Sequence, residues 1–382
     1  MIYLDAAATT PVRREVLEAM WPLLTSEYGN PSSHHTVGES AARVLGYART
    51  LVATELNCKP ADVVFTSGGT EADNLAIKGI ALARPKGRHI LASAIEHPAV
   101  LETLDYLKRL HGFRVTLLPV TSEGLVREEA LREALDPETT LCTIMYANNE
   151  VGTVQPLASL AAMCHEQGVP FHTDAVQAAG WLPLDTTELG VDAMSISGHK
   201  LGAPKGCGVL YVRSRLPLEP LVHGGGQERG RRSGTENVAG AVAIATALRL
   251  AHQARTEHSA ASVARRDHLV RTVLEGVDGA VLTGHPTQRL PNIASFCFPG
   301  ASGEAILLEL ERAGVVSSSG SACAAGASEP SAVLLAMGLE AEVAQTALRL
   351  SWTAATSDAE IALAARAVVS SVRTVQGIGS RA

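Results

Sequence analysis

Between residues 62 and 200, short apolar runs alternate with longer amphipathic segments, and this alternation constrains the fold more than any other feature of the sequence. The short runs have the length of buried strands, whereas the longer segments repeat apolar side chains at helical spacing. Such alternation predicts an α/β fold with a mainly parallel sheet and helices on both faces. The predicted strands lie at 62–66, 89–93, 114–118, 141–146, 169–174 and 191–197, and the helices between them at 71–82, 100–110 and 157–167.

Polar residues gather where these predicted strands end. Because the carboxyl ends of parallel strands meet at one edge of a sheet, where ligands of open α/β sheets bind, we expect these residues to form one rim. Singly, each has an ordinary explanation as a turn residue, an Asx turn or, for Asp174, the cap of a helix at 175–179. The rim comprises Thr70, Glu96, His97, Asn148, Asn149, Glu150, Asp174, Gln177, Ser197 and His199.

Lys200 follows the last of these strands, which ends at a cluster of glycines. A lysine near the mouth of an apolar sheet has its ammonium form disfavoured by desolvation, which favours the neutral amine that Schiff-base chemistry needs. A lone lysine at such a place is usually a solvated loop residue. The neighbouring polar rim is what favours a chemical role for Lys200.

The loop Ser67-Gly68-Gly69-Thr70 joins a predicted strand to a predicted helix. Backbone N–H groups that no Cβ obstructs, together with the Thr70 hydroxyl, can hold a phosphate at the positive end of the helix. The loop lacks G-x-G-x-x-G and the lysine of a nucleotide P-loop, which favours a phosphate ester other than a dinucleotide or ATP. Loops of this composition also occur simply as turns.

Pyridoxal 5′-phosphate is the cofactor that requires this set of residues. It needs a lysine for its aldehyde, a carboxylate for its ring nitrogen and a site for its phosphate. Lys200, Asp174 and the loop with Gly69 and Thr70 supply these three. His97 is suited to stack on the ring, and Gln177 to donate to its phenolic oxygen.

Composition narrows the remaining possibilities. A chain of 382 residues with 46% hydrophobic residues is long enough for about two domains, and a net charge of −7 gives no sign of direct nucleic-acid binding. The sequence predicts neither a signal peptide nor a membrane span, so we expect a cytoplasmic protein. Its six cysteines lie far apart without a C-x-x-C pair, which predicts no metal site and no disulfide framework.

The sequence resembles the cysteine desulfurases of the class-V aminotransferase group, which are fold-type-I pyridoxal-phosphate enzymes. Within that group it resembles the iron–sulfur-cluster-assembly branch, in which the loop with the catalytic cysteine is longer. The resemblance covers nearly the whole chain. It rests on ordered motifs at 3–5, 9–11, 30–34, 66–71, 74–76, 96–97, 148–152, 174–177, 197–200, 202–206, 224–230, 232–235 and 318–323.

The resemblance also implies roles for individual residues. It implies that His97 stacks on the cofactor ring, and that Asn149 and Gln177 approach the phenolic oxygen. Arg349 and Asn149 would bind the substrate. Thr235 would reach the cofactor phosphate of a neighbouring subunit, which makes the protein a homodimer with shared sites. The phosphate of the chain's own cofactor would be held by Gly69, Thr70, Ser197 and His199.

The C-terminal third predicts a smaller α+β domain. We expect a domain change at 255–259, between a helix at 239–251 and an amphipathic helix at 258–277. Strands at 293–298, 315–317 and 348–352 predict a small sheet, backed by a helix at 304–312 and a final helix that a Ser357/Glu360 capping box begins. The expected division is a large domain at 15–256 and a small domain formed by 1–14 and 257–382, the first residues being placed by the resemblance.

Two residues of this smaller domain are candidates for chemistry. Cys323 lies in a run of small and polar residues, 317–329, that has almost nothing to bury. A free cysteine is more often buried and inert, but an exposed thiol in such a loop can become a reactive thiolate. Arg349 lies in an apolar strand, where an unpaired charge is costly, and a substrate carboxylate is the natural partner. We expect the other five cysteines to be structural.

The expected reaction is the pyridoxal-phosphate-dependent conversion of L-cysteine to L-alanine. Lys200 would move the Cα proton, Cys323 would take the sulfur as a persulfide, and His97 is a candidate proton carrier. An acceptor protein would then receive the sulfur for iron–sulfur clusters, tRNA thiolation or DNA phosphorothioation, which the sequence does not distinguish. The alternatives are a selenocysteine lyase or aminotransferase of the same fold, and a non-enzymatic partner protein that presents sulfur machinery.

The chain departs from the family pattern at two places. Residues 351–356 read Ser-Trp-Thr-Ala-Ala-Thr where the family has a glycine and a second arginine, so we expect different local packing there. The sequence ends at Ala382, without the longer tail that some relatives use to dock a scaffold protein.

Overall fold

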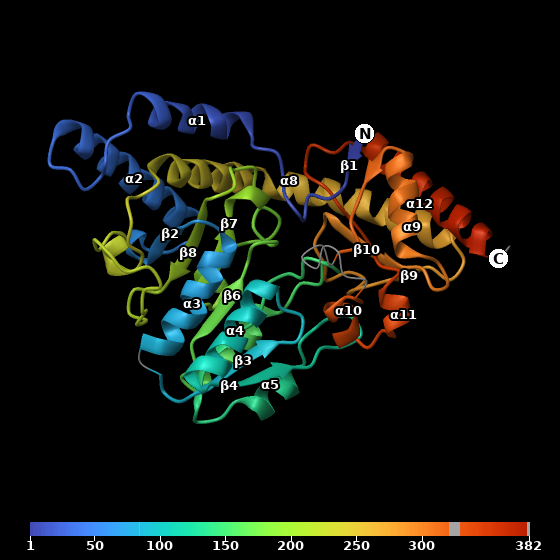
Figure 1. Cartoon of the computed structure of the whole chain (residues 1–382), viewed down its shortest axis with the longest axis horizontal. Coiled ribbons are helices and arrows are strands. Elements are labelled where there is room, and N and C mark those ends of the chain that lie inside the picture. Colours follow the sequence, from blue (N-terminus) through green and yellow to red (C-terminus); the bar gives the residue numbers. More distant parts are fainter. Residues whose placement is uncertain (84, 321–328, 380–382) are drawn as a thin grey trace.

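The computed structural model describes residues 1–83, 85–320 and 329–379. Its largest sheet has the strand order β2-β8-β7-β6-β5-β3-β4 (Figure 1). Strands β3 to β7 pair in parallel, while β8 runs antiparallel to both of its neighbours. The mainly parallel sheet is therefore confirmed. Its strands are β2 (Val63–Thr66), β3 (His89–Ser93), β4 (Arg114–Leu118), β5 (Thr139–Thr143), β6 (Phe171–Asp174), β7 (Ala193–Ser197) and β8 (Gly208–Val212).

Helices cover both faces of this sheet, as the sequence predicts. Side chains alternate along each strand, so neighbours such as Val63 and Val64 enter different apolar cores. One core contains α3 (Gly69–Ala83) and α4 (Pro98–His111), and the other contains α2 (Thr36–Glu55), α6 (Leu157–Glu166) and the first part of α8 (Val238–Gly276). The shorter elements are α1 (Arg14–Thr25), η1 (Pro60–Asp62), α5 (Glu128–Ala134), α7 (Thr186–Leu189), η2 (Gly198–Lys200) and η3 (Glu228–Gly230).

A second body forms around a three-stranded antiparallel sheet of order β12-β10-β9. Helix α12 begins at the predicted capping box, since the Ser357 N–H donates to Glu360 Oε2 and the Glu360 N–H donates to Ser357 Oγ. This body contains β9 (Val281–Leu282), β10 (Ile293–Cys297), α9 (Gly303–Arg312), β12 (Leu348–Ser351) and α12 (Asp358–Gly379). The buried apolar residues of α10 (Ala332–Ala336) and α11 (Ala341–Ala344) instead join the core that contains α2 and α6.

The prediction that residues 315–317 join this small sheet is wrong. Strand β11 (Val315–Val316) instead pairs in parallel with β1 (Ile2–Tyr3), the first strand of the chain. Asp5 then makes an isolated bridge with Ser351, at the end of β12. The N-terminal segment is thus held against the C-terminal body by backbone hydrogen bonds.

The predicted helix break at 255–259 is also wrong, because α8 is continuous over 39 residues. Its buried positions stop at Ala251 and resume at Ser262, where the helix passes from one core to the next (Figure 1). The loss of apolar periodicity therefore marks a change of core. Neither proline nor glycine occurs between 252 and 261 to end the helix. The domain division 15–256 against 1–14 and 257–382 stays a prediction, and its boundary falls inside α8.

Two further differences concern local elements. Residues 175–179 form turns where the sequence analysis expected a helix, although Asp174 Oδ1 does accept the Val176 N–H at 2.8 Å. Strand β8, which that analysis did not predict, inserts between β2 and β7. None of the helices in the described ranges combines the length and the apolarity needed to cross a membrane.

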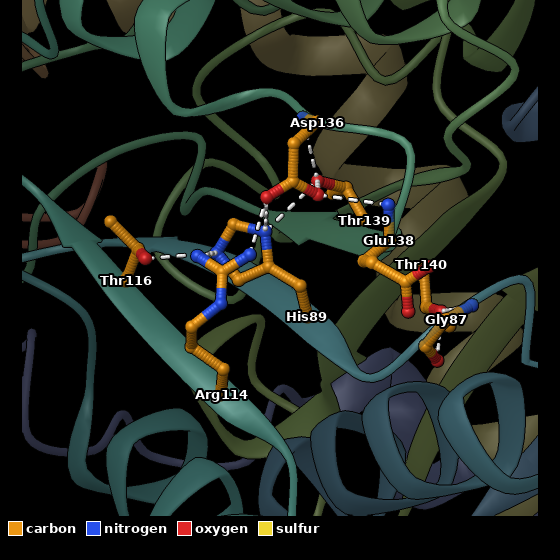
Figure 2. A network of polar contacts seen from close by, with 8 residues as sticks. All are labelled: Gly87, His89, Arg114, Thr116, Asp136, Glu138, Thr139 and Thr140. Atoms are coloured by element: carbon orange, nitrogen blue, oxygen red, sulfur yellow. Dashed lines mark hydrogen bonds and ion pairs between the residues drawn. The ribbon is translucent and has the colours of Figure 1, made fainter.

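The amino ends of β3, β4 and β5 are joined by a polar network, which Figure 2 shows. His89 lies between two hydroxyl groups, with Nε2 at 2.8 Å from Thr116 Oγ1 and Nδ1 at 3.0 Å from Thr139 Oγ1. Arg114 forms an ion pair with Asp136 beside it. Burial lowers the pKa of His89, so the ring stays neutral and bridges the three strands at the end opposite to the predicted rim.

Candidate active site

A cavity of about 560 Å³ lies at the carboxyl ends of β6 and β7. It brings together every predicted cofactor and substrate residue of the described chain except Thr235. Seven of the ten predicted rim residues therefore line one hollow, whereas Glu96, Asn148 and Glu150 do not line it. The predicted residues that line it are Gly69, Thr70, His97, Asn149, Asp174, Gln177, Ser197, His199, Lys200 and Arg349.

Lys200 ends η2, the short 3₁₀ turn that directly follows β7. Its ammonium group donates hydrogen bonds to the carbonyl oxygens of Ala7 and of Ala8, the latter at 2.8 Å. The Gln177 amide also donates to the Ala7 carbonyl, at 3.0 Å. The N-terminal segment therefore forms one wall of the cavity beside the lysine, which the sequence analysis did not predict.

Asp174 is the last residue of β6 and is buried. Burial raises the pKa of its carboxyl group, while His97, the Val176 N–H and Lys200 each lower it. A buried carboxylate at this position is stabilised by any cation that enters the cavity. This is the property that a cofactor ring nitrogen requires.

His97 precedes α4 and caps it, since its Nδ1 accepts the Ala99 N–H at 3.1 Å. Burial is the largest influence on this imidazole and lowers its pKa. In the neutral ring the proton must then reside on Nε2, because Nδ1 is an acceptor. The capping bond fixes the ring orientation at the cavity wall.

One end of the cavity is suited to an anion. Helix α3 begins at Gly69, so its first N–H groups face this end together with Thr70. A Cβ at Gly69 would lie 2.7 Å from Val176 Cγ2, so only glycine lets the backbone come this close. The pKa of His199 is lowered to about 4, first by burial and then by the charges of Lys200 and Lys205. An anion bound here would relieve this accumulation of positive charge.

Arg349 approaches from β12 on the opposite side and is buried. Its Nη2 donates to Asp5 Oδ1 at 2.7 Å, and its Nη1 donates to the Asn149 carbonyl at 2.9 Å. Its Nε has no hydrogen-bond partner among the described residues. The guanidinium is thus held at the cavity by residues of three distant segments, in a place where a small carboxylate can reach it.

Two residues for which the resemblance or the sequence predicts a role in cofactor binding or sulfur transfer, Thr235 and Cys323, are not among those that line this cavity. Thr235 is exposed and borders a separate hollow with Ser67 and Arg232. Cys323 lies outside the described residues. Among the thiols that the structure describes, burial raises the pKa of Cys58 to about 12, and that of Cys207 and Cys297 to about 11, so these groups stay protonated at neutral pH.

The residues present fit pyridoxal phosphate. The glycine-lined start of α3 has space for a phosphate, the buried Asp174 carboxylate has the charge that a ring nitrogen needs, and Lys200 has the amine that an aldehyde needs. All three line the same cavity. These are observations on the side chains themselves, independent of any relative.

Sequence reasoning missed the partners of these residues. Asp5 belongs to a motif that it noted, but nothing in the motif indicates a contact with Arg349, 344 positions away. Asp73, on α3, also lines the cavity, although in the sequence it is one polar position of a helix. Backbone carbonyls such as that of Ala7 leave no signal in a sequence at all.

Comparisons with known proteins agree with this geometry. The aminotransferase class-V family model matches residues 2–363. A cysteine desulfurase IscS of Methanosarcina thermophila is 46% identical over 351 residues, 92% of this chain and 86% of that protein. A solved NifS-like protein superposes with a TM-score of 0.90 at 37% identity, covering 97% of this chain and 98% of that one.

A second solved structure of similar fold contains cysteine. It is described as SspA in complex with cysteine, and it is 36% identical with a TM-score of 0.81, covering 92% of this chain and 98% of its own. The match of the family model and the identity to curated desulfurases agree with the fold and with the residues of the cavity. The chain belongs to the class-V aminotransferase family, among its pyridoxal-phosphate-dependent cysteine desulfurases.

Proposed function

We propose that this desulfurase binds L-cysteine between Lys200 and Arg349 and passes its sulfur, as a persulfide on Cys323, to an acceptor protein in the cytoplasm. The observation that carries the proposal is that one cavity holds Lys200, Asp174, His97 and Arg349. A buried arginine whose Nε has no hydrogen-bond partner among the described residues, opposite a lysine, suits an α-amino acid substrate, whose carboxylate and amine lie on the same carbon.

Each residue has a distinct task. Arg349 binds the substrate carboxylate and so fixes which bond of Cα faces Lys200, whose amine takes the Cα proton. Pyridoxal phosphate, when bound, supplies an aldehyde for the substrate amine and a ring that accepts electrons. The Cys323 thiolate attacks the substrate sulfur, which forms the S–S bond of the persulfide as the C–S bond breaks. His97 Nε2 carries the proton that completes L-alanine.

Mixing the purified protein with L-cysteine, and assaying L-alanine and protein-bound persulfide in parallel, tests this function. We expect the two products in equal amounts during the first turnover. Cys323→Ser should form no persulfide and lower alanine formation by at least about 10²-fold, because none of the five described thiols lines the cavity that holds Lys200. Cys58→Ser is the matched control, since it removes a half-exposed thiol whose pKa is raised to about 12.

Sulfide release by Cys323→Ser at the parent rate would contradict the proposal. It would favour the alternative of a lyase that needs no cysteine nucleophile. Equal loss in Cys58→Ser would show that both substitutions act through folding.

The homodimer is the second part of the proposal. The loop before Thr235 is rigidly held, since Glu228 forms a buried ion pair with Arg49 at 2.7 Å and accepts the Phe65 N–H. Glu228 and Arg229 adopt left-handed φ values of 48° and 60°, which only such contacts maintain in residues other than glycine. Thr235 is exposed and does not line the cavity of its own chain that holds Lys200. A second copy is the partner whose phosphate site it can complete.

Thr235→Ala should weaken cofactor binding about 10- to 100-fold, the effect of losing one hydrogen bond to a charged group. Thr235→Ser, which keeps the hydroxyl, should bind the cofactor as the parent does. Cofactor retention and dimer content are measured together over a dilution series, by absorbance and analytical ultracentrifugation. A monomer that keeps its cofactor on dilution would refute the shared site.

A further inference from the structure

Three carboxyl groups are buried at the cofactor cavity, which two of them, Asp73 and Asp174, line. Asp73, Glu96 and Asp174 expose 1%, 3% and 6% of their surfaces, and burial first, then the charge of Asp174, raises the pKa of Asp73 and of Glu96. Only Asp174 has an assigned task. A cluster of this kind cannot carry three negative charges in a buried site, so part of it must hold protons.

The surroundings of Asp73 are those of a neutral acid. Its Oδ1 is buried and has no hydrogen-bond partner among the described residues, and a hydrogen bond from Ser195 is its one stabilising contact of that kind. The nearest basic group is His172, whose Nε2 lies 3.8 Å from Oδ1. Ionised carboxylates in protein interiors gather several donors or a cation, whereas Asp73 has one hydroxyl donor and an imidazole at 3.8 Å.

His172 does not supply the missing charge. Its ring is fully buried between two hydroxyls, with Nδ1 at 2.8 Å from Thr143 Oγ1 and Nε2 at 3.0 Å from Ser195 Oγ. Burial lowers the pKa of His172 to about 3, so the ring is neutral. If Ser195 donates to Asp73, it accepts from Nε2–H, and Thr143 donates to Nδ1. His172, Ser195 and Thr143 are then hydrogen-bonded to one another without a net charge.

Of Asp73 and Asp174, Asp174 has the better-stabilised carboxylate. It accepts the Val176 N–H at 2.8 Å, and both His97 and Lys200 lower its pKa. Glu96 is intermediate, because its Oε1 accepts Ser93 Oγ at 2.5 Å and the Met145 N–H at 2.8 Å while its Oε2 has no partner among the described residues. When two interacting carboxyls share one negative charge, it resides on the one with more donors and cations.

We propose that Asp73 is a positioning residue of the cofactor site that stays protonated beside Asp174 and so confines the negative charge to the carboxylate facing the cofactor ring. The link between Asp73 and catalysis rests on the proposed role of Asp174 toward that ring. The protonation of Asp73 itself depends only on the folded chain. Asp73 does not touch the reacting atoms, and it acts through Ser195 and Asp174.

Infrared spectroscopy of the holoenzyme tests the proton directly. With the carboxyl carbon of aspartate labelled with ¹³C, the protein at neutral pH should show the carbonyl stretch of a protonated acid, shifted by the label. Asp73→Asn, the uncharged isostere, should lose this band. Glu96→Gln is the matched control, because it removes a neighbouring acid that the label does not report and should leave the band in place.

The pH dependence of unfolding is the second readout. A carboxyl whose folded pKa is raised binds its proton more tightly when folded, so its contribution favours the folded state at low pH. That contribution is lost as the pH rises from the unfolded pKa, near 3.9, toward the folded one. The ratio of unfolding constants, parent over Asp73→Asn, should therefore rise with pH above the unfolded pKa, by up to about tenfold per pH unit, until the folded pKa is reached. A purely structural role would give a ratio independent of pH.

An absent band in the labelled parent protein would overturn the proposal, even if Asp73→Asn failed to fold. Parallel unfolding profiles would overturn it as well. Both readouts are independent of desulfurase activity. A carbonyl band without cysteine turnover would leave the Asp73 assignment standing and refute the proposed function. Cysteine turnover without the band would refute the Asp73 assignment and leave the proposed function standing.

Discussion

Lys200→Ala will leave a folded protein that no longer links the cofactor covalently. Lys200 is the cavity lysine that follows β7 and donates to the carbonyls of Ala7 and Ala8, so its removal deletes both the aldehyde partner and the amine that moves the Cα proton. We expect kcat to fall about 10²- to 10⁴-fold from the loss of proton transfer alone. Borohydride reduction followed by peptide mass spectrometry measures the covalent link.

Lys205→Ala is the matched control for this prediction. Lys205 also lines the cavity, and its charge also lowers the pKa of His199, but it lies five residues further along the chain. The control should keep the covalent link and lose some affinity for the phosphate. A reducible cofactor that remains attached to the Lys200→Ala protein would assign the aldehyde partner to another lysine.

Arg349→Ala will impair the use of L-cysteine more than any other substitution outside the lysine and the cysteine loop. Removing one partner of a buried, hydrogen-bonded charge pair costs about 2–5 kcal/mol, so we expect kcat/KM to fall by about two to three orders of magnitude. Arg349→Lys should recover little, because an ammonium cannot reproduce the two parallel hydrogen bonds. Steady-state kinetics with L-cysteine measure the effect.

Asp5→Asn separates substrate binding from stability. It keeps the Arg349 guanidinium but removes the anion that holds it at 2.7 Å. If Arg349 binds the substrate carboxylate, Asp5→Asn should change KM far less than Arg349→Ala does, although both lower the melting temperature. Equal kinetic effects in the two variants would reduce Arg349 to a structural partner of Asp5.

The sequence by itself determined the parallel strands of the sheet, most of the polar rim at their carboxyl ends, and the chemistry of the main residues. These follow from local physics: periods of 2 and 3.6 residues distinguish strands from helices, glycines end a strand before Lys200, and parallel strands place Asp174 and Ser197 at one edge. The capping box at Ser357 and Glu360 is equally local, and it was predicted for the same reason.

Only the tertiary structure decided the contacts between distant segments. Strand β8 enters the sheet between β2 and β7, and β11 pairs with β1, because strand order depends on packing and not on chain order. Helix α8 continues past residue 255 because it serves two cores in turn, so its apolar periodicity lapses while its backbone hydrogen bonds do not. The pairing of Arg349 with Asp5 and the burial of Asp73 beside Asp174 arise in the same way. A charge and its partner are chosen by proximity and desolvation, and neither exists until the chain has folded.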